Sequence, residues 1–231
     1  MHIEAMQKLT LLDYPGKTAA TLFTHGCNFR CPFCHNAGLV IRKSELSVSE
    51  EEVLAYLDKR KKMLDGICIT GGEPLLQSDI AEFIKKVRAL GYAVKLDTNG
   101  SFPEKLKALI DEGLVDYVAV DIKNSPEKYE MTAGAKNILE KVKETVNILK
   151  EGKVDFEFRT TVCGNLHTAE DMRAIGEWLR GTKNYFIQPF KDSGDIVCGS
   201  EYADSFACST ALAEDLLAAV REFLPNAAIR G

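Results

Sequence analysis

Short apolar runs rich in β-branched residues alternate with longer segments of helical periodicity from residue 18 to the end of the chain. This alternation is typical of a parallel sheet whose strands are joined by crossover helices. The apolar runs predict six strands, at 18–24, 66–70, 93–97, 117–122, 155–162 and 184–189. The periodic segments predict helices near 47–62, 78–90, 103–112, 136–150, 168–180 and 209–223. The sequence therefore predicts a series of six β/α units.

Residues at the ends of these segments support the predicted helices. Ser47 stands three residues before Glu50, which is the spacing of a capping box, and Thr168 precedes an acidic first turn. Pro103 suits a first helical turn, where its missing backbone N–H is not needed. Glycines mark three positions at which a helix should end before the next strand: Gly91, Gly113 and Gly181.

Six units are too few for the closed eight-stranded barrel, whose usual length is about 250 residues. A doubly wound open sheet would use the same elements. The polar motifs described below favour a barrel, because each follows the C-terminal end of a different strand, where barrels collect their active sites. We expect an incomplete (β/α)6 TIM-type barrel of parallel strands as a single domain over 18–231, preceded by a short extension, 1–17, with a turn at 11–16.

The composition of the 231 residues is that of an ordinary globular protein, with 45% hydrophobic and 27% charged residues and a net charge of −5. No run of lysine and arginine is long enough to indicate a nucleic-acid surface or a membrane patch. The densest, at 59–62, fits the last turn of a helix. No segment approaches the roughly 18 apolar residues of a membrane span, and residues 1–4 do not begin a signal peptide. We expect a cytoplasmic protein that binds neither nucleic acid nor membrane.

Seven cysteines, an odd number without an export signal, indicate reduced thiols rather than disulfides. Cys27, Cys31 and Cys34 form a C-x3-C-x2-C run directly after the first predicted strand, so their thiolates can converge on one inorganic centre. A structural zinc ion would need a fourth ligand, which His25 or His35 could supply. Three thiolates on a 4Fe-4S cluster would instead leave one iron open for catalysis, and this alternative is favoured.

Further polar motifs follow the other predicted strands. The glycine pair at 71–72, within Gly-Gly-Glu-Pro, lets the backbone approach a ligand closely or form a tight turn. The Asp-Thr-Asn-Gly segment at 97–100 would suit a hairpin, but a helix that begins at Pro103 follows it instead. Asp121 and Lys123 are two residues apart at a strand end, so we expect their side chains on the same face.

The C-x3-C-x2-C run, with Phe33 directly before the last cysteine, resembles the signature of the radical S-adenosylmethionine (SAM) enzymes, and the resemblance covers nearly the whole chain. It implies a 4Fe-4S cluster held by the three cysteines. Gln188 stands where related activases often carry a histidine near the adenine, and its amide can both donate and accept there. The resemblance implies SAM contacts from Phe33, Gly71, Gly72, Glu73, Asp97, Asn99, Asp121, Lys123, Arg159 and Gln188. It also implies a monovalent cation beside Asp97, Thr98 and Asp121.

Within this family, the stretches 11–17, 24–31 and 34–36 are most similar to the activating proteins of anaerobic ribonucleotide reductases. The similarity implies that an electron from a flavodoxin or ferredoxin-type reductant cleaves SAM, and that the resulting 5′-deoxyadenosyl radical takes a hydrogen atom from a glycine of the partner protein. No second cysteine cluster interrupts 35–46, unlike activases with ferredoxin-like inserts. The alternatives are a radical enzyme acting on a small molecule or peptide, and a non-catalytic iron-sulfur carrier or zinc module.

The remaining cysteines have no regular spacing. Cys68 lies inside a predicted strand and is expected in the core. Cys163, Cys198 and Cys208 follow the last two predicted strands and are one ligand short of an auxiliary cluster, so we expect free thiols. The segment 191–205 could form a lid over the site.

Overall fold

The computed structural model describes residues 1–41, 47–192 and 194–230. Its strands form one sheet in which spatial order follows chain order from β1 to β8. β1 is antiparallel to β2, and each later strand is parallel to its predecessor. The strands are β1 (Ile3–Thr10), β2 (Ala19–Thr24), β3 (Gly66–Gly71), β4 (Ala93–Thr98), β5 (Tyr117–Asp121), β6 (Asp155–Val162), β7 (Tyr185–Pro189) and β8 (Ala228–Ile229).

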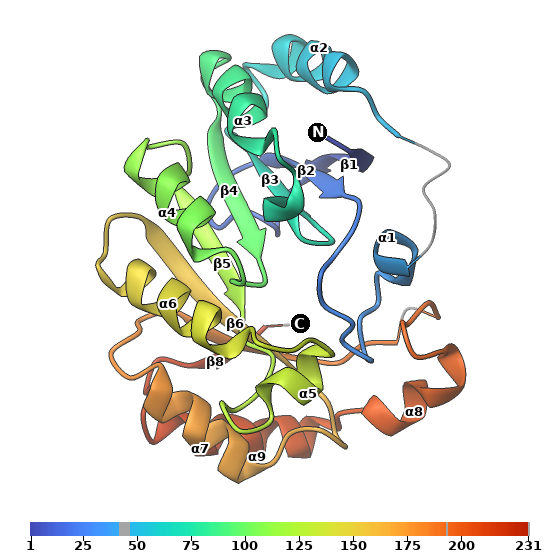
Figure 1. Cartoon of the computed structure of the whole chain (residues 1–231), viewed down its shortest axis with the longest axis vertical. Helices are drawn as coiled ribbons and strands as arrows, with labels where there is room; N and C mark the ends of the chain where they lie inside the picture. The colour runs from blue at the N-terminus through green and yellow to red at the C-terminus, as the bar shows by residue number, and fades with distance from the viewer. Residues whose placement is uncertain (42–46, 193, 231) are drawn as a thin grey trace.

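Helices connect the parallel strands, and Figure 1 shows α3, α4 and α6 along the outer side of the curved sheet. α7 and α9 pack against each other. None of the described helices is long and apolar enough to cross a membrane. The helices are α1 (Ala37–Ile41), α2 (Glu50–Arg60), α3 (Ile80–Ala89), α4 (Pro103–Asp111), α5 (Tyr129–Ala133), α6 (Leu139–Lys150), α7 (Ala169–Trp178), α8 (Ala203–Phe206) and α9 (Thr210–Arg221), with short 3-10 helices η1 (Pro74–Leu76) and η2 (Ser200–Tyr202).

The six predicted parallel strands and the six predicted helices are all present, and the incomplete barrel is confirmed. The described strands form an open sheet, since β1 and β8 are its two edges. The structure adds β1 within the predicted extension and the two-residue β8. β1 has only two buried residues, Ile3 and Thr10, so it lacks the apolar run by which a strand is recognised.

Two of the predicted helix caps have different outcomes. The cap predicted at Ser47 is wrong: Ser49 caps α2, and Glu52 completes the box by accepting from the Ser49 backbone N–H. Three successive glutamates follow Ser49, so the capping spacing occurs twice in this stretch and the sequence alone did not separate the two registers. The cap at Thr168 is confirmed, with the Asp171 carboxylate accepting from its backbone N–H.

Successive residues of the parallel strands point to opposite faces of the sheet, as the strand period requires. The face toward the helices is apolar and fully buried, with Leu22, Ile67, Ile69, Val94, Leu96, Val118 and Val120 in one core cluster. The opposite face is polar and includes Thr21, Asp97, Asp121, Arg159, Thr161 and Gln188. The interior of the open barrel is therefore a cavity lined by polar side chains rather than a packed apolar core.

Candidate active site

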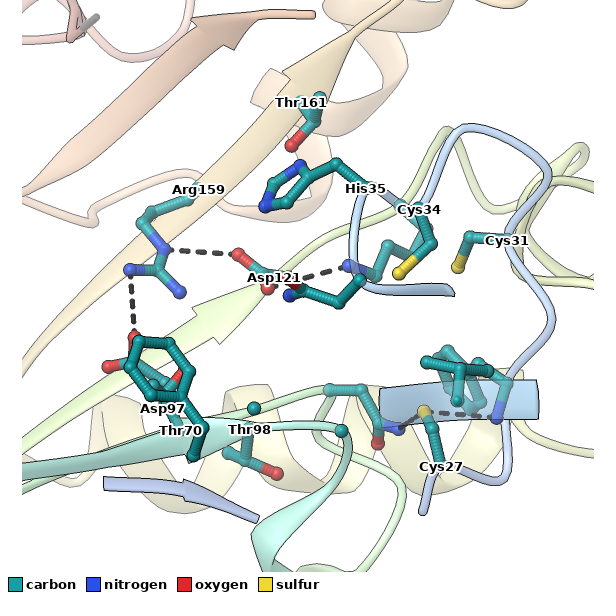
Figure 2. A pocket seen from close by; sticks show the side chains of 18 of the residues that line it. Cys27, Cys31, Cys34, His35, Thr70, Asp97, Thr98, Asp121, Arg159 and Thr161 are labelled. Atoms are coloured by element: carbon teal, nitrogen blue, oxygen red, sulfur yellow. Dashed lines mark hydrogen bonds and ion pairs between the residues drawn. The ribbon is translucent and has the colours of Figure 1, made fainter. Parts of the chain in front are cut away.

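The cavity inside the open barrel has a volume of about 320 Å³ (Figure 2). Its lining reaches the carboxyl ends of several strands and the loop that follows β2. The predicted site residues that line it are Cys27, Phe33, Cys31, Cys34, Gly71, Gly72, Asp97, Thr98, Asn99, Asp121, Lys123, Arg159 and Gln188. Glu73 is the one predicted site residue that does not, because its side chain is completely buried.

Cys27, Cys31 and Cys34 gather at one end of this cavity (Figure 2). Burial raises the pKa of the Cys27 thiol to about 11 and that of Cys31 to about 12. Without a metal these two thiols are protonated at neutral pH. A positively charged iron centre would displace the protons, because only the thiolate is a ligand.

The spacing of the three sulfur atoms separates a cluster from a single zinc ion. Thiolates on one tetrahedral zinc ion lie about 3.8 Å apart, given Zn–S bonds of about 2.3 Å. The sulfurs of Cys27, Cys31 and Cys34 do not all lie within 4.8 Å of one another. His25, one of the two candidate fourth ligands, instead lies 3.2 Å from the Glu4 carboxylate. The trio is therefore spaced too widely for one ion and would fit a polynuclear centre better.

Backbone hydrogen bonds from three directions hold the cysteine loop. The N–H of Gly26 donates to the carbonyl of Leu39 in α1, at 2.8 Å, and that of Arg30 donates to Ala133 at the end of α5, at 2.9 Å. The N–H of Val197 donates to the Cys34 carbonyl at 3.1 Å. The loop is therefore preorganised by elements distant in the chain.

The glycine pair of the Gly-Gly-Glu-Pro segment permits a close approach between two backbones. Gly71 has φ +112°, and a Cβ there would lie 2.4 Å from the Thr24 backbone nitrogen. A Cβ on Gly72 would lie 1.9 Å from the carbonyl oxygen of Gly26. Both glycines line the cavity. Since they have no side chains, their backbone groups face the cavity next to the cysteine loop. The sequence predicted either a close approach to a ligand or a tight turn. The structure shows a close approach to the backbone of Thr24, at the end of β2, and of Gly26, at the start of the cysteine loop.

Glu73 connects the glycine segment to the end of β4. Its carboxylate accepts from the Thr98 hydroxyl at 2.7 Å and from the backbone N–H of Asn99 at 2.7 Å. Burial raises its pKa to about 7, although these hydrogen bonds oppose the shift. The Asn99 amide in turn donates to Asn28 at 2.9 Å and approaches the Cys27 sulfur at 3.9 Å. The Glu73 side chain therefore positions neighbouring loops and is not exposed to the cavity.

Arg159 occupies the centre of a charged wall, facing inward as predicted (Figure 2). Its Nε lies 3.0 Å from Asp121 Oδ1, and its Nη1 lies 3.2 Å from Asp97 Oδ2. Lys123 Nζ lies 3.4 Å from Asp121 Oδ2, which confirms that these two side chains share a face. Although burial acts in the opposite sense, Arg159 and Lys123 lower the pKa of Asp121, and Asp121 raises that of Lys123. Asp121, Lys123 and Arg159 are therefore charged at neutral pH.

The predicted cation site already contains protein cations. Asp97 is ion-paired with both Arg159 and the buried Lys95, and Asp121 with Arg159. The Thr98 hydroxyl donates to Glu73. A monovalent ion would have to compete with these partners, and its presence stays a prediction.

Several cavity residues were missed by the sequence analysis. Gln7 belongs to β1, and Asp13 follows it and accepts from the Thr21 hydroxyl at 2.5 Å. Thr161 also lines the cavity. His35, which the sequence indicated only as a candidate zinc ligand, lines it too, and burial lowers the pKa of His35. Thr161 lies two residues after Arg159 in β6, so strand alternation alone could have placed it on the inner face.

The remaining cysteines form no metal-binding group with one another among the residues described. Cys68 is buried as predicted, with its sulfur 3.7 Å from both Asp97 and Lys95. Cys163 is buried, while Cys198 and Cys208 are partly exposed. In the predicted lid, the N–H of Cys198 donates to the Pro32 carbonyl at 3.2 Å, so this part of 191–205 lies against the cysteine loop; residue 193 lies outside the described residues.

The family model of the radical SAM superfamily matches residues 21–179, from β2 to the end of α7. The chain belongs to the radical SAM superfamily. Membership implies a 4Fe-4S cluster and SAM as cofactors, and the cysteine trio and the charged cavity wall fit both. The cavity is therefore the expected cofactor site of a radical SAM enzyme.

Two relatives of this radical SAM chain carry different names. A Methanocaldococcus jannaschii protein, provisionally named a glycyl-radical enzyme activating enzyme, is 34% identical over 84% of this chain and 82% of its own length. A Thermococcus kodakarensis protein, named a probable GTP 3′,8-cyclase, is 31% identical over 69% of this chain. The match spans only 53% of that second relative.

Solved structures support the radical SAM fold. A radical SAM methyltransferase from Sphaerobacter thermophilus superposes with a TM-score of 0.72, covering 96% of this chain and 68% of the other. The two sequences are 15% identical, so this likeness concerns the fold alone.

Proposed function

We propose that this radical SAM enzyme installs a glycyl radical on a partner protein. The observation that carries the proposal is the extent of the match to the glycyl-radical enzyme activating enzyme, which covers 84% of this chain and 82% of that protein. The match to the cyclase leaves nearly half of that protein unmatched. The shared region thus corresponds more closely to a whole activating enzyme.

In this proposal, Cys27, Cys31 and Cys34 hold the 4Fe-4S cluster and leave one iron for SAM. When bound, the cluster supplies the electron that cleaves SAM to methionine and a 5′-deoxyadenosyl radical. Backbone hydrogen bonds to the cysteine loop hold the thiolates in place before the cofactor arrives. The Asn99 amide, 3.9 Å from the Cys27 sulfur, can donate to a bound thiolate and stabilise its charge.

The charged wall matches the charges of SAM. The cavity presents two cations, Arg159 and Lys123, and two anions, Asp97 and Asp121. SAM carries an anionic carboxylate together with a cationic amine and sulfonium. We assign the carboxylate to Lys123 and Arg159, the ribose to Asp121, and the adenine edge to Phe33 and Gln188. The methionine amine then lies by the backbone of Gly71, Gly72 and Glu73, and a cation by Asp97, Thr98 and Asp121 belongs to the same proposal.

The proposed substrate is a glycine in an anaerobic ribonucleotide reductase, with a flavodoxin or ferredoxin-type protein as reductant. The stretches 11–17, 24–31 and 34–36 support it by their resemblance to the activating proteins of that enzyme. The sheet edges support it as well, because β1 and β8 leave the cavity wall open at the side. A peptide loop can enter an open barrel more easily than a closed one.

Electron paramagnetic resonance tests this proposal. An anaerobic mixture of reduced enzyme, SAM and the candidate reductase should give a glycyl doublet, and the signal should vanish when the accepting glycine is replaced. A Cys34→Ala variant is the matched negative control. SAM cleavage without a doublet would assign the radical to another substrate.

A small-molecule substrate is the second candidate, supported by the match to the probable GTP 3′,8-cyclase. Incubation of the reduced enzyme with SAM and GTP would detect it. A product derived from GTP at a rate close to that of SAM cleavage would favour this alternative over activation of a protein.

A further inference from the structure

The β1–β2 pair extends by one residue beyond the two strands, next to the cysteine loop. Ile3 is the register partner of Thr24, and the N–H of His25 donates to the carbonyl of His2 at 3.3 Å. His2 and His25 therefore lie opposite each other, with rings stacked at a centroid distance of 4.9 Å. Glu4 is two residues from His2, so an extended chain directs both side chains to the same face.

This arrangement brings three potential metal ligands together. Glu4 Oε2 lies 3.2 Å from His25 Nδ1 and 3.7 Å from His2 Nε2. One ligand atom from each residue lies within 4.8 Å of the other two. No other three His, Cys, Asp or Glu side chains in the described part of the chain meet this condition.

Two of these ligand atoms are buried without a hydrogen bond. Glu4 Oε2 and His25 Nδ1 form no hydrogen bond within the described structure, although they lie close to each other. Buried polar atoms of this kind are rare, because desolvation without a hydrogen bond costs free energy. Gln77 holds the backbones on both sides, accepting from the N–H of His2 at 3.0 Å and donating to the carbonyl of His25 at 3.0 Å. Gln77 therefore fixes the backbones that carry the two histidines relative to each other.

We propose that His2, Glu4 and His25 bind one divalent transition-metal ion, separate from the cysteine trio. Two imidazoles and one carboxylate suit a borderline ion such as Zn²⁺ and leave a fourth position for water. The His2 side chain is 43% exposed, so it can turn its Nε2 toward the ion. Because His25 lies two residues before Cys27, the ion ties β1 to the start of the cysteine loop.

The test uses the full chain with its iron-sulfur cluster assembled anaerobically, so that the cysteines are occupied. Zn²⁺ is added, unbound metal is removed by desalting, and zinc and iron are counted by mass spectrometry. We expect about one zinc per chain with iron unchanged. His25→Ala and Glu4→Gln should each reduce zinc at least tenfold, while Glu104→Gln, a change to an exposed carboxylate on α4, should not.

X-ray absorption at the zinc edge identifies the ligands and remains informative if a variant folds poorly. Nitrogen and oxygen neighbours at about 2.0–2.2 Å, with no sulfur at about 2.3 Å, are expected for this site. Three results would overturn the proposal: sulfur neighbours, no retained zinc, or equal zinc in the wild type and in both ligand variants.

Discussion

The two faces of the sheet differ although they consist of alternate residues of the same strands. In β4, Val94 and Leu96 point toward the helices, into the apolar core, whereas Lys95 and Asp97 point to the opposite face, toward the barrel interior and its cavity. The outer residues contribute free energy of folding through burial of apolar surface. The inner residues bring charges into a buried site, where each must be paired to avoid a large desolvation cost. The strand period thus separates stability and chemistry into two faces.

On the inner face, charged side chains pair with one another across neighbouring strands. Arg159 bridges carboxylates from β4 and β5. Two residues earlier in β6, Glu157 accepts two hydrogen bonds from Arg230, at 2.7 and 3.0 Å. An apolar filling is usual in the interior of closed β/α barrels. The charged filling here leaves a cavity that can hold a charged cofactor, which an apolar filling would exclude.

The largest expected effect is on the cluster proposed at the cysteine trio, at one end of the cavity. Cys27→Ala, Cys31→Ala or Cys34→Ala should each abolish the iron content and charge-transfer absorption after anaerobic reconstitution, because each removes one of three protein ligands. Iron analysis and absorption spectra measure this. Cys198→Ala, whose side chain has no role in the proposed site, is the control and should retain full iron. Normal iron in any of the three ligand variants would assign the cluster to other residues.

The outer face should respond in the opposite way. Leu96→Ala leaves a void in the core and should lower the free energy of unfolding by about 2–5 kcal/mol, while the iron content per folded chain is unchanged. Denaturant unfolding measures the loss. Leu96→Met, which nearly conserves volume, should cost less than about 1.5 kcal/mol. Loss of iron in the folded Leu96→Ala protein would show that the two faces are not separable.

Replacing Lys123 tests the inner face without leaving an unpaired buried charge. In Lys123→Met, Asp121 keeps its ion pair with Arg159, so stability should change little. The affinity for SAM should fall by about 1.5–3 kcal/mol, or about 10- to 150-fold, the range for loss of a hydrogen bond to a charged group. Equilibrium binding of SAM to the cluster-loaded protein measures this. Lys143→Met on α6 is the control, and equal affinities in the two variants would remove Lys123 from the SAM site.

Glu73 gives the smallest effect at any one pH step, and it tests how burial changes the ionisation of a single carboxylate. Burial raises its pKa from 4.5 to about 7, so between these values the folded state binds more protons than the unfolded state. Its contribution to stability is therefore greatest below pH 4.5 and is lost as the pH rises toward 7, by at most about 1.4 kcal/mol per pH unit. Glu73→Gln should flatten the dependence over this range, as measured by denaturant unfolding at several pH values. An unchanged slope would mean that Glu73 is ionised throughout.

Local signals in the sequence sufficed for the parallel strands β2 to β7, the main helices and the cysteine loop. Apolar runs and helical periodicity depend on neighbouring residues, and three cysteines within eight positions need no tertiary information to be recognised. The alternation of Lys95 and Asp97 with Val94 and Leu96 was likewise present in the chain. This alternation distinguishes two faces of the strand but does not indicate which of them encloses a cavity.

Only the tertiary structure decided how distant residues combine. The Arg159 bridge depends on the register of three strands, the buried position of Glu73 depends on a loop from β4, and the grouping of Glu4 with His25 depends on an edge strand with almost no apolar pattern. Strand register and edge pairing arise from contacts between segments far apart in the chain. Such contacts are determined by the packing of the whole domain, because a local pattern is compatible with several partners.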